Sequence, residues 1–201
     1  MFGVVLPQNF ETPYRALSLQ DFWRRWHMTL SRFLRDYLYI PLGGNRHGLP
    51  VQVMALFATM ALGGLWHGAG MTFVVWGAAH GAALGIGLLW RRAGLPMPPV
   101  LGWALTFLFV AVTFVLFRAA SFDAAMRIYE GMVGLSGFGG GFKWRAIAIA
   151  AAFAMIGPTA WVAVHKAPPS RALAVVSAIL FTLILFKIGD DANYEFIYFQ
   201  F

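Results

Sequence analysis

Five histidines are the residues of this 201-residue sequence best able to exchange protons near neutral pH. They are His27, His47, His67, His80 and His165. Their spacings match no metal motif, and the sequence contains no cysteine, so we predict no metal site. No serine stands in a nucleophile-elbow motif, and no glycine-rich loop with lysine could hold a phosphate. The case for an enzyme therefore rests on a histidine.

His67 is the strongest candidate, because it lies in the segment GGLWHGAG (63–70) within a long stretch that holds no charged residue. An ionisable group at membrane depth is costly and by default marks function. Burial without a nearby acid keeps an imidazole uncharged, and an uncharged imidazole can act as a general base toward a hydroxyl. The alternative is a structural histidine, whose ring nitrogens bond to carbonyls freed where the helix breaks. The pattern leaves both interpretations open.

His27 belongs to a helix that we predict from Leu19 onward, with Ser18 as its N-cap. Apolar residues recur there every three or four positions, and arginines take the opposite face. This pattern favours an amphipathic helix that is interfacial or re-entrant in a membrane over one packed on a soluble partner domain. We expect His27 at the edge of the aromatic face to support catalysis rather than perform it. The further supporting or substrate-binding candidates are Arg24, Ser31 and, beside the catalytic histidine, Trp66.

The composition indicates a membrane protein, because 60% of the residues are hydrophobic and only 11% are charged. Soluble domains carry roughly 25% charged residues. The net charge of +7 does not predict nucleic-acid binding, since the basic residues stand mostly as singles or pairs at the ends of apolar runs. Cations in those places meet lipid headgroups.

Residues 51–90 are all uncharged and cannot form one span. A straight helix of that length would be about 60 Å long, whereas the hydrocarbon core is about 30 Å thick. We therefore predict a broken helix at 63–70, surrounded by protein or by a cavity, and a close-packing ridge of glycines in the following helix. The fold class is all-α: a multi-span helical integral membrane protein. The predicted spans are about 51–66, 71–90, 100–117, 146–164 and 172–187, with a short surface helix at 122–133.

Two motifs give the sequence a family resemblance. Residues 21–48 (DFWRRWHMTLSRFLRDYLYIPLGGNRHG) resemble the signature of bacterial membrane-bound O-acyltransferases, above all the alginate O-acetyltransferase branch and more distantly the teichoic acid D-alanyl transferases. Residues 63–70 are similar to the active-site histidine motif of that family. The segments 116–134 and 196–201 resemble later landmarks of the branch.

The resemblance implies transfer of an acyl group, expected to be acetyl, to a hydroxyl of an exported polysaccharide or of a relay protein. The donor would be a cytosolic thioester, such as acetyl-CoA or an acyl-carrier thioester, and no cofactor is expected. His67 would be the essential histidine and His27 the second motif histidine. The expected location is the bacterial inner membrane, with periplasmic polysaccharide acetylation proteins as partners.

The resemblance also implies that residues 1–201 are the C-terminal part of a single acyltransferase domain. Members of the family carry further spans before the first motif, so we expect an N-terminal half to be missing from this chain. Two other functions stay open. One is a non-catalytic membrane module that assembles with a partner or is inactive. The other is a transporter, which the absence of a paired acid and base in the spans disfavours.

Overall fold

The computed structural model describes residues 7–135, 137, 144–159, 161–162 and 170–190. It divides into two units, residues 1–159 and residues 160–201. In the described residues every regular element is helical. The first unit contains η1 (Pro13–Arg15), α1 (Leu19–Arg25), α2 (Met28–Leu34), the π-helix η2 (Arg35–Tyr39), α3 (Leu49–His67), α4 (Met71–Arg92), α5 (Pro99–Arg118), α6 (Phe122–Met132) and α7 (Trp144–Ile156), and the second contains α9 (Arg171–Asp190).

Three helices, α3, α4 and α5, are long and apolar enough to cross a membrane in the part of the chain that the structure describes. Their bounds agree with the predicted spans 51–66, 71–90 and 100–117 to within about two residues, since a charge-free run leaves little choice of where a span begins and ends. The all-α, multi-span fold class is confirmed. The protein is a multi-pass membrane protein.

The span predicted over 146–164 can be followed only in part, since residues 160, 163 and 164 lie outside the described residues. The helix there, α7, ends at Ile156 after 13 residues. Gly157 and Pro158 follow it, and proline cannot donate the backbone hydrogen bond that would continue a helix. At 1.5 Å per residue α7 is about 20 Å long, too short to cross the hydrocarbon core by itself. The other late span, predicted over 172–187, is covered by α9.

Helices α3 and α4 form an antiparallel hairpin whose backbones nearly touch. A Cβ atom on Gly77 would overlap the carbonyl oxygen of Met60, and one on Gly81 would lie 2.7 Å from the Cα of Phe57. Further along, Gly85 faces the side chain of Val53. The predicted glycine ridge of α4 therefore packs on α3, and small residues allow this close approach where two spans meet in lipid.

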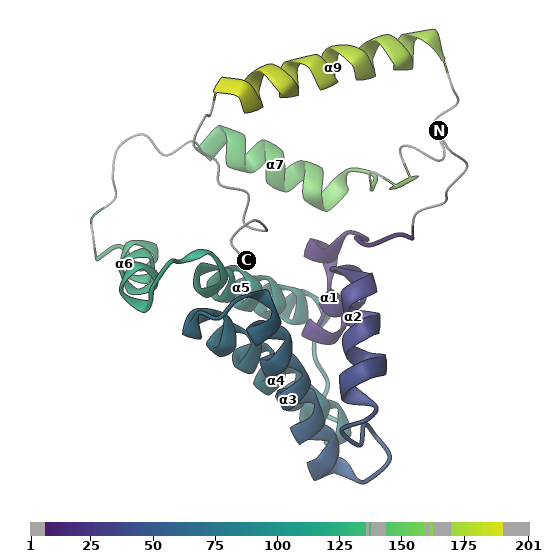
Figure 1. The fold of residues 1–201 in the computed structure, drawn as a ribbon, viewed down its shortest axis with the longest axis vertical. Coiled ribbons are helices and arrows are strands. Elements are labelled where there is room, and N and C mark those ends of the chain that lie inside the picture. Colours follow the sequence, from purple (N-terminus) through teal and green to yellow (C-terminus); the bar gives the residue numbers. More distant parts are fainter. Residues whose placement is uncertain (1–6, 136, 138–143, 160, 163–169, 191–201) are drawn as a thin grey trace. The chain divides into compact units, whose positions relative to one another are not determined.

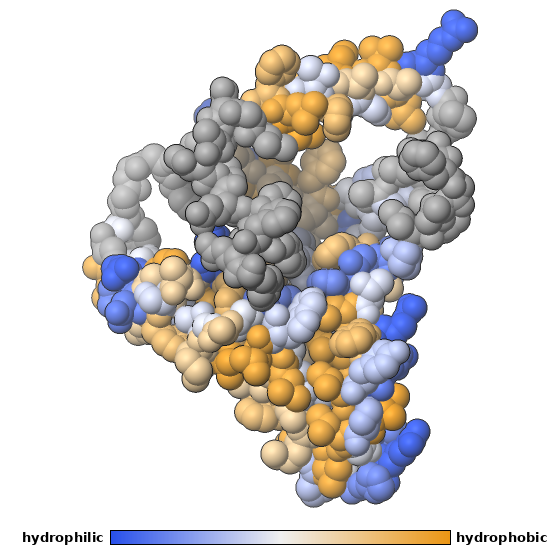
Figure 2. Space-filling view, in the orientation of Figure 1, coloured by the Kyte–Doolittle hydropathy of each residue, from blue (hydrophilic) through white to orange (hydrophobic). Residues whose placement is uncertain are grey.

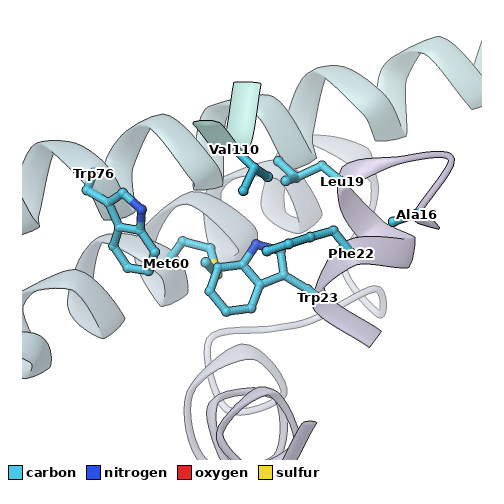
Figure 3. Packing of buried hydrophobic residues seen from close by; sticks show 7 residues of the cluster. All are labelled: Ala16, Leu19, Phe22, Trp23, Met60, Trp76 and Val110. Atoms are coloured by element: carbon cyan, nitrogen blue, oxygen red, sulfur yellow. The ribbon is translucent and has the colours of Figure 1, made fainter. Parts of the chain in front are cut away.

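Helix α1 lies against the hairpin and α5 (Figure 1). Its apolar side chains enter the main buried cluster, where the rings of Trp23 and Trp76 are 5.9 Å apart and Met60 contributes from α3 (Figure 3). The cluster consists of Ala16, Leu19, Phe22, Trp23, Met60, Trp76 and Val110. The aromatic face of α1 thus packs on helices of its own chain.

The surface of the three candidate spans is largely hydrophobic, whereas hydrophilic side chains gather along the edge formed by α2 (Figure 2). Large apolar side chains such as Met54, Val100 and Leu108 are more than half exposed. Exposed apolar area of this extent is expected where a helix faces lipid tails.

Candidate active site

His67 is the last residue of α3, at the point where the helical backbone breaks. Gly68, Ala69 and Gly70 follow it, and α4 begins at Met71. The break predicted over 63–70 is confirmed only in its second half. Gly63 and Gly64 remain helical, because Gly64 is needed where α3 meets Gly77 of α4, its Cα lying 3.0 Å from where a Cβ on Gly77 would stand. The unwound segment is therefore Gly68–Gly70.

Three aromatic rings surround the imidazole of His67. The ring centroids of Trp66, Trp76 and Phe117 lie 5.2, 5.6 and 5.1 Å from its own. The ring is half-buried, and in the described part of the chain neither of its nitrogens forms a hydrogen bond. The structural interpretation required carbonyl partners for these nitrogens, and the described residues do not provide them. Neither nitrogen is therefore engaged by a described residue.

His27 marks a second break in the backbone, which the sequence analysis did not predict. The helix expected to continue from Leu19 is divided into α1 and α2 at Trp26–His27, and His27 adopts a left-handed conformation with φ 45°. Few residues other than glycine adopt it, and histidine is among the more tolerant ones. The placement of His27 on one continuous helical wheel was therefore wrong.

Asn9 holds this break in place, and sequence reasoning missed it. Its side-chain oxygen accepts hydrogen bonds from the backbone N–H and the hydroxyl of Thr29, at 3.1 and 2.9 Å. Its backbone carbonyl accepts a third from the N–H of Met28 at 2.9 Å. Together these bonds satisfy donors at the start of α2 that a helix terminus leaves unpaired. The only sequence signal for this cap was the asparagine itself, and it lies 20 positions before the residue that it caps.

Two aromatic side chains each have a buried nitrogen that lacks a hydrogen-bond partner among the described residues: Nδ1 of His27 and Nε1 of Trp76. His27 lies outside the candidate spans, and burial lowers the pKa of its imidazole, so it is uncharged at neutral pH. The ring of His27 lies 6.0 Å from that of Phe10. The ring of Trp76 lies 5.6 Å from that of His67, so the free indole N–H of Trp76 is a donor next to the candidate base.

His80 is fully buried and bonded at both ring nitrogens. The indole N–H of Trp23 can only donate, so Nδ1 of His80, 3.2 Å away, must accept. Nε2 then carries the hydrogen and donates to the hydroxyl of Thr113 at 3.0 Å, which itself donates to the carbonyl of Phe109. This chain of donors keeps His80 neutral and leaves it no free nitrogen for catalysis.

The predicted supporting residues divide into two places. Trp66 lies against His67 but is 59% exposed. Arg24 and Ser31 instead line a cavity of about 440 Å³ between α1–α2 and the α3–α4 hairpin, and His67 is not part of its described lining. The hydroxyl of Ser31 also donates to the carbonyl of Trp26 at 3.4 Å, which helps to hold the break.

No group of three histidine, cysteine or acidic side chains that could hold a metal ion occurs in the described residues. His67 itself is an imidazole beside aromatic rings and one indole donor. The sequence could point to His67 through its motif. It could not point to Trp76 or Phe117, because their contacts with His67 arise only when α4 and α5 fold back on α3.

Comparison with known proteins places the chain within one family. The family model described as MBOAT, membrane-bound O-acyltransferase family, matches residues 1–124. That match includes α1 to α5 and both candidate histidines.

Several named proteins are similar in sequence to part of this chain. A peptidoglycan O-acetyltransferase of Helicobacter pylori is 49% identical over 140 residues, which are 68% of this chain and 27% of the relative. A probable alginate O-acetylase of Pseudomonas aeruginosa is 48% identical over 136 residues, 66% of this chain and 26% of the relative. A teichoic acid D-alanyltransferase of Streptococcus thermophilus is 29% identical over 143 residues, 58% of this chain and 34% of the relative. The chain spans about a quarter of the length of the first two relatives.

Proposed function

Since this chain belongs to the membrane-bound O-acyltransferase family, we propose that it carries the histidine-bearing part of an enzyme that acylates a hydroxyl of an exported polysaccharide. His67 is the general base of this enzyme. The observation that carries the proposal is the environment of His67: an imidazole with both nitrogens unbonded among the described residues, at a helix end, among aromatic rings.

The reaction needs one proton acceptor and one acyl donor. A ring nitrogen of His67 removes the proton from the acceptor hydroxyl while the oxygen attacks the carbonyl carbon of a thioester. The new C–O bond forms, the C–S bond breaks, and the proton passes from the imidazolium to the departing thiolate. His67 is neutral again at the end of the cycle, so no cofactor is consumed.

The names of the relatives support the proposed acceptor and acyl group. Two of them are named for O-acetylation, one of peptidoglycan and one of alginate, and both names refer to carbohydrate polymers. We propose acetyl as the group and a cytosolic thioester, acetyl-CoA or an acyl carrier, as its donor. The proposed location is the bacterial inner membrane, with periplasmic polysaccharide acetylation proteins as partners.

Replacement of the histidine tests the proposal. We expect His67→Gln, in the protein as its native gene encodes it, to lower acetyl-ester formation on cell-surface polymers by at least about 100-fold, the range of lost general-base catalysis. The matched control is His47→Gln, at an exposed position in the turn before α3. Both variants should accumulate in the membrane at the level of the unchanged protein. Unchanged acetylation in the His67→Gln strain would refute the assignment and favour a non-catalytic module.

A further inference from the structure

Trp76 has an indole N–H that is buried and has no partner among the residues that the structure describes. The side chain is only 3% exposed, and its Nε1 has no hydrogen-bond acceptor there. Trp23, another buried tryptophan, instead donates to His80 at 3.2 Å. A buried indole N–H normally has a partner, because an unpaired donor in apolar surroundings is costly. The exception at Trp76 therefore points to an acceptor that the described chain does not supply.

The orientation of this indole is fixed by four neighbouring rings. They belong to Trp23, His80, His67 and Phe117, whose centroids lie 5.9, 4.8, 5.6 and 5.1 Å from that of Trp76. Figure 3 shows the side chain within the buried cluster. A donor that is held in this way does not have to reorganise when a negative charge develops beside it.

The four neighbours divide into a buried pair and a partly exposed pair. Trp23 and His80 are buried, whereas His67 and Phe117 are each partly exposed. Among these ring contacts, a substrate therefore approaches the indole from the side of His67 and Phe117. The nitrogen itself is shielded from water, so a small rotation of one of these two rings accompanies binding.

The proposed acyl transfer creates an acceptor for such a donor. When the hydroxyl oxygen attacks the thioester, an electron pair of the C=O bond moves to the carbonyl oxygen, which becomes an oxyanion. A general base lies about 3 Å from the attacking oxygen, and an oxyanion donor lies about 3 Å from the oxyanion. Because both oxygens are bonded to one carbon, the base and the donor must be neighbours, as His67 and Trp76 are.

We propose that the indole N–H of Trp76 is a catalytic hydrogen-bond donor that stabilises this oxyanion. The inference rests on the proposed function. An indole nitrogen can only donate, so its N–H bond stays intact throughout the cycle. The oxyanion accepts the hydrogen bond, then re-forms the C=O bond as the C–S bond breaks, and the proton transfers at His67 are unchanged. The surrounding rings exclude water, which strengthens such a hydrogen bond.

Replacement of the N–H alone tests this role. Trp76→benzothienylalanine, introduced by amber suppression, keeps a fused ring of nearly the same shape but has sulfur in place of the N–H. Trp76→Phe removes the N–H together with part of the ring. The matched controls carry the same two replacements at Trp90, which is 41% exposed in the last turn of α4. All variants are made in the protein as its native gene encodes it, and acetyl esters on cell-surface polymers are measured per amount of protein in the membrane.

We expect both Trp76 variants, but not the Trp90 controls, to form acetyl esters about 100-fold more slowly, the usual effect of removing one oxyanion donor. In membrane vesicles supplied with acetyl-CoA, kcat should fall while KM changes less than about threefold, because the bond forms only as the charge develops. The unfolding temperature of the Trp76→benzothienylalanine protein should equal that of the unchanged protein, since its ring contacts remain.

Full acetylation by the Trp76→benzothienylalanine protein would overturn the inference, whatever the activity of Trp76→Phe, because only the shape of the ring would then matter. A raised KM with unchanged kcat would also overturn it, since the N–H would then bind only the ground state. The His67→Gln protein separates these outcomes from failure of the proposed function. If loss of the imidazole stops acetylation and loss of the N–H does not, the acyltransferase assignment stands without a role for Trp76.

Discussion

The ring of His80 is neutral because of the donors and acceptors around it. Trp23 can only donate to it, and the Thr113 hydroxyl already donates to backbone carbonyls, which leaves His80 to donate in turn. Each hydrogen bond in this series depends on the next one. Loss of one member therefore leaves a buried polar group unpaired, which costs more than a single hydrogen bond is worth.

Substitution at Thr113 tests this dependence. Thr113→Val keeps the shape of the side chain but leaves the Nε2–H of His80 without an acceptor, so we expect a loss of about 1–3 kcal/mol in the free energy of unfolding. Thr106→Val on the same helix is the control. The Thr106 hydroxyl also bonds to its own helix, at the carbonyl of Gly102, but no described side chain donates to it. Denaturation of both proteins in detergent should show the difference, and equal loss would contradict the proposed chain.

His27 contributes a pH dependence whose sign follows from its burial. Its folded-state pKa is lowered by desolvation, whereas the unfolded chain has the ordinary value of about 6.5. Below about pH 6.5 the unfolded state therefore binds the proton more readily. The stability associated with neutral His27 is fully present above that pH and is lost as the pH falls toward the lower folded value.

We expect the unfolding temperature to fall less between pH 7 and pH 5.5 in His27→Asn than in the unchanged protein. Asparagine tolerates the left-handed backbone at this position but does not titrate. The unfolding temperatures of both proteins are measured across this pH range. Contributions from titrating groups that the two proteins share cancel in the difference. Parallel curves would show that the imidazole does not titrate with folding.

At the scale of elements, the spans could be predicted because they are set by local composition. The charge-free runs around α3, α4 and α5 leave the chain no alternative in lipid, and their bounds agree closely with the prediction. The break at His27 could not be predicted, because it depends on Asn9, which is distant along the chain. Gly63 and Gly64 were predicted to be part of the break, but they belong to α3. Their small size serves packing of the hairpin, and only the folded pair of helices reveals that.

The glycines of α4 differ in what they face. Alanine substitutions at two of them should therefore change the free energy of unfolding differently. Gly77→Ala would drive a methyl group into the carbonyl of Met60 on α3, and overpacking of this kind costs about 1–3 kcal/mol. A Cβ on Gly87 meets only the end of the Arg91 side chain, 3.6 Å away. There alanine should be neutral or stabilise by about 0.5–1 kcal/mol, since it lowers the entropy of the unfolded chain. Thermal unfolding in detergent compares the two, and equal effects would argue against the close hairpin.

At the scale of the molecule, α3 separates the turn at His47 from the break that follows His67. Its 19 residues rise about 28 Å, close to the thickness of the hydrocarbon core. His47 lies in the turn before its beginning, and His67 lies at its end. The two ends of α3 should therefore face opposite sides of the membrane.

Labelling of single cysteines tests this arrangement, and the sequence contains no cysteine that would interfere. His47→Cys and Ala69→Cys replace exposed residues on either side of α3. We expect a membrane-impermeant maleimide, added to sealed vesicles of known orientation, to label one variant from outside and the other only after permeabilisation. Labelling of both from the same side would show that α3 does not cross.

The rings around His67 come from three different spans, since Trp66, Trp76 and Phe117 belong to α3, α4 and α5. A displacement of any one of these helices along its neighbours would therefore alter the surroundings of the imidazole.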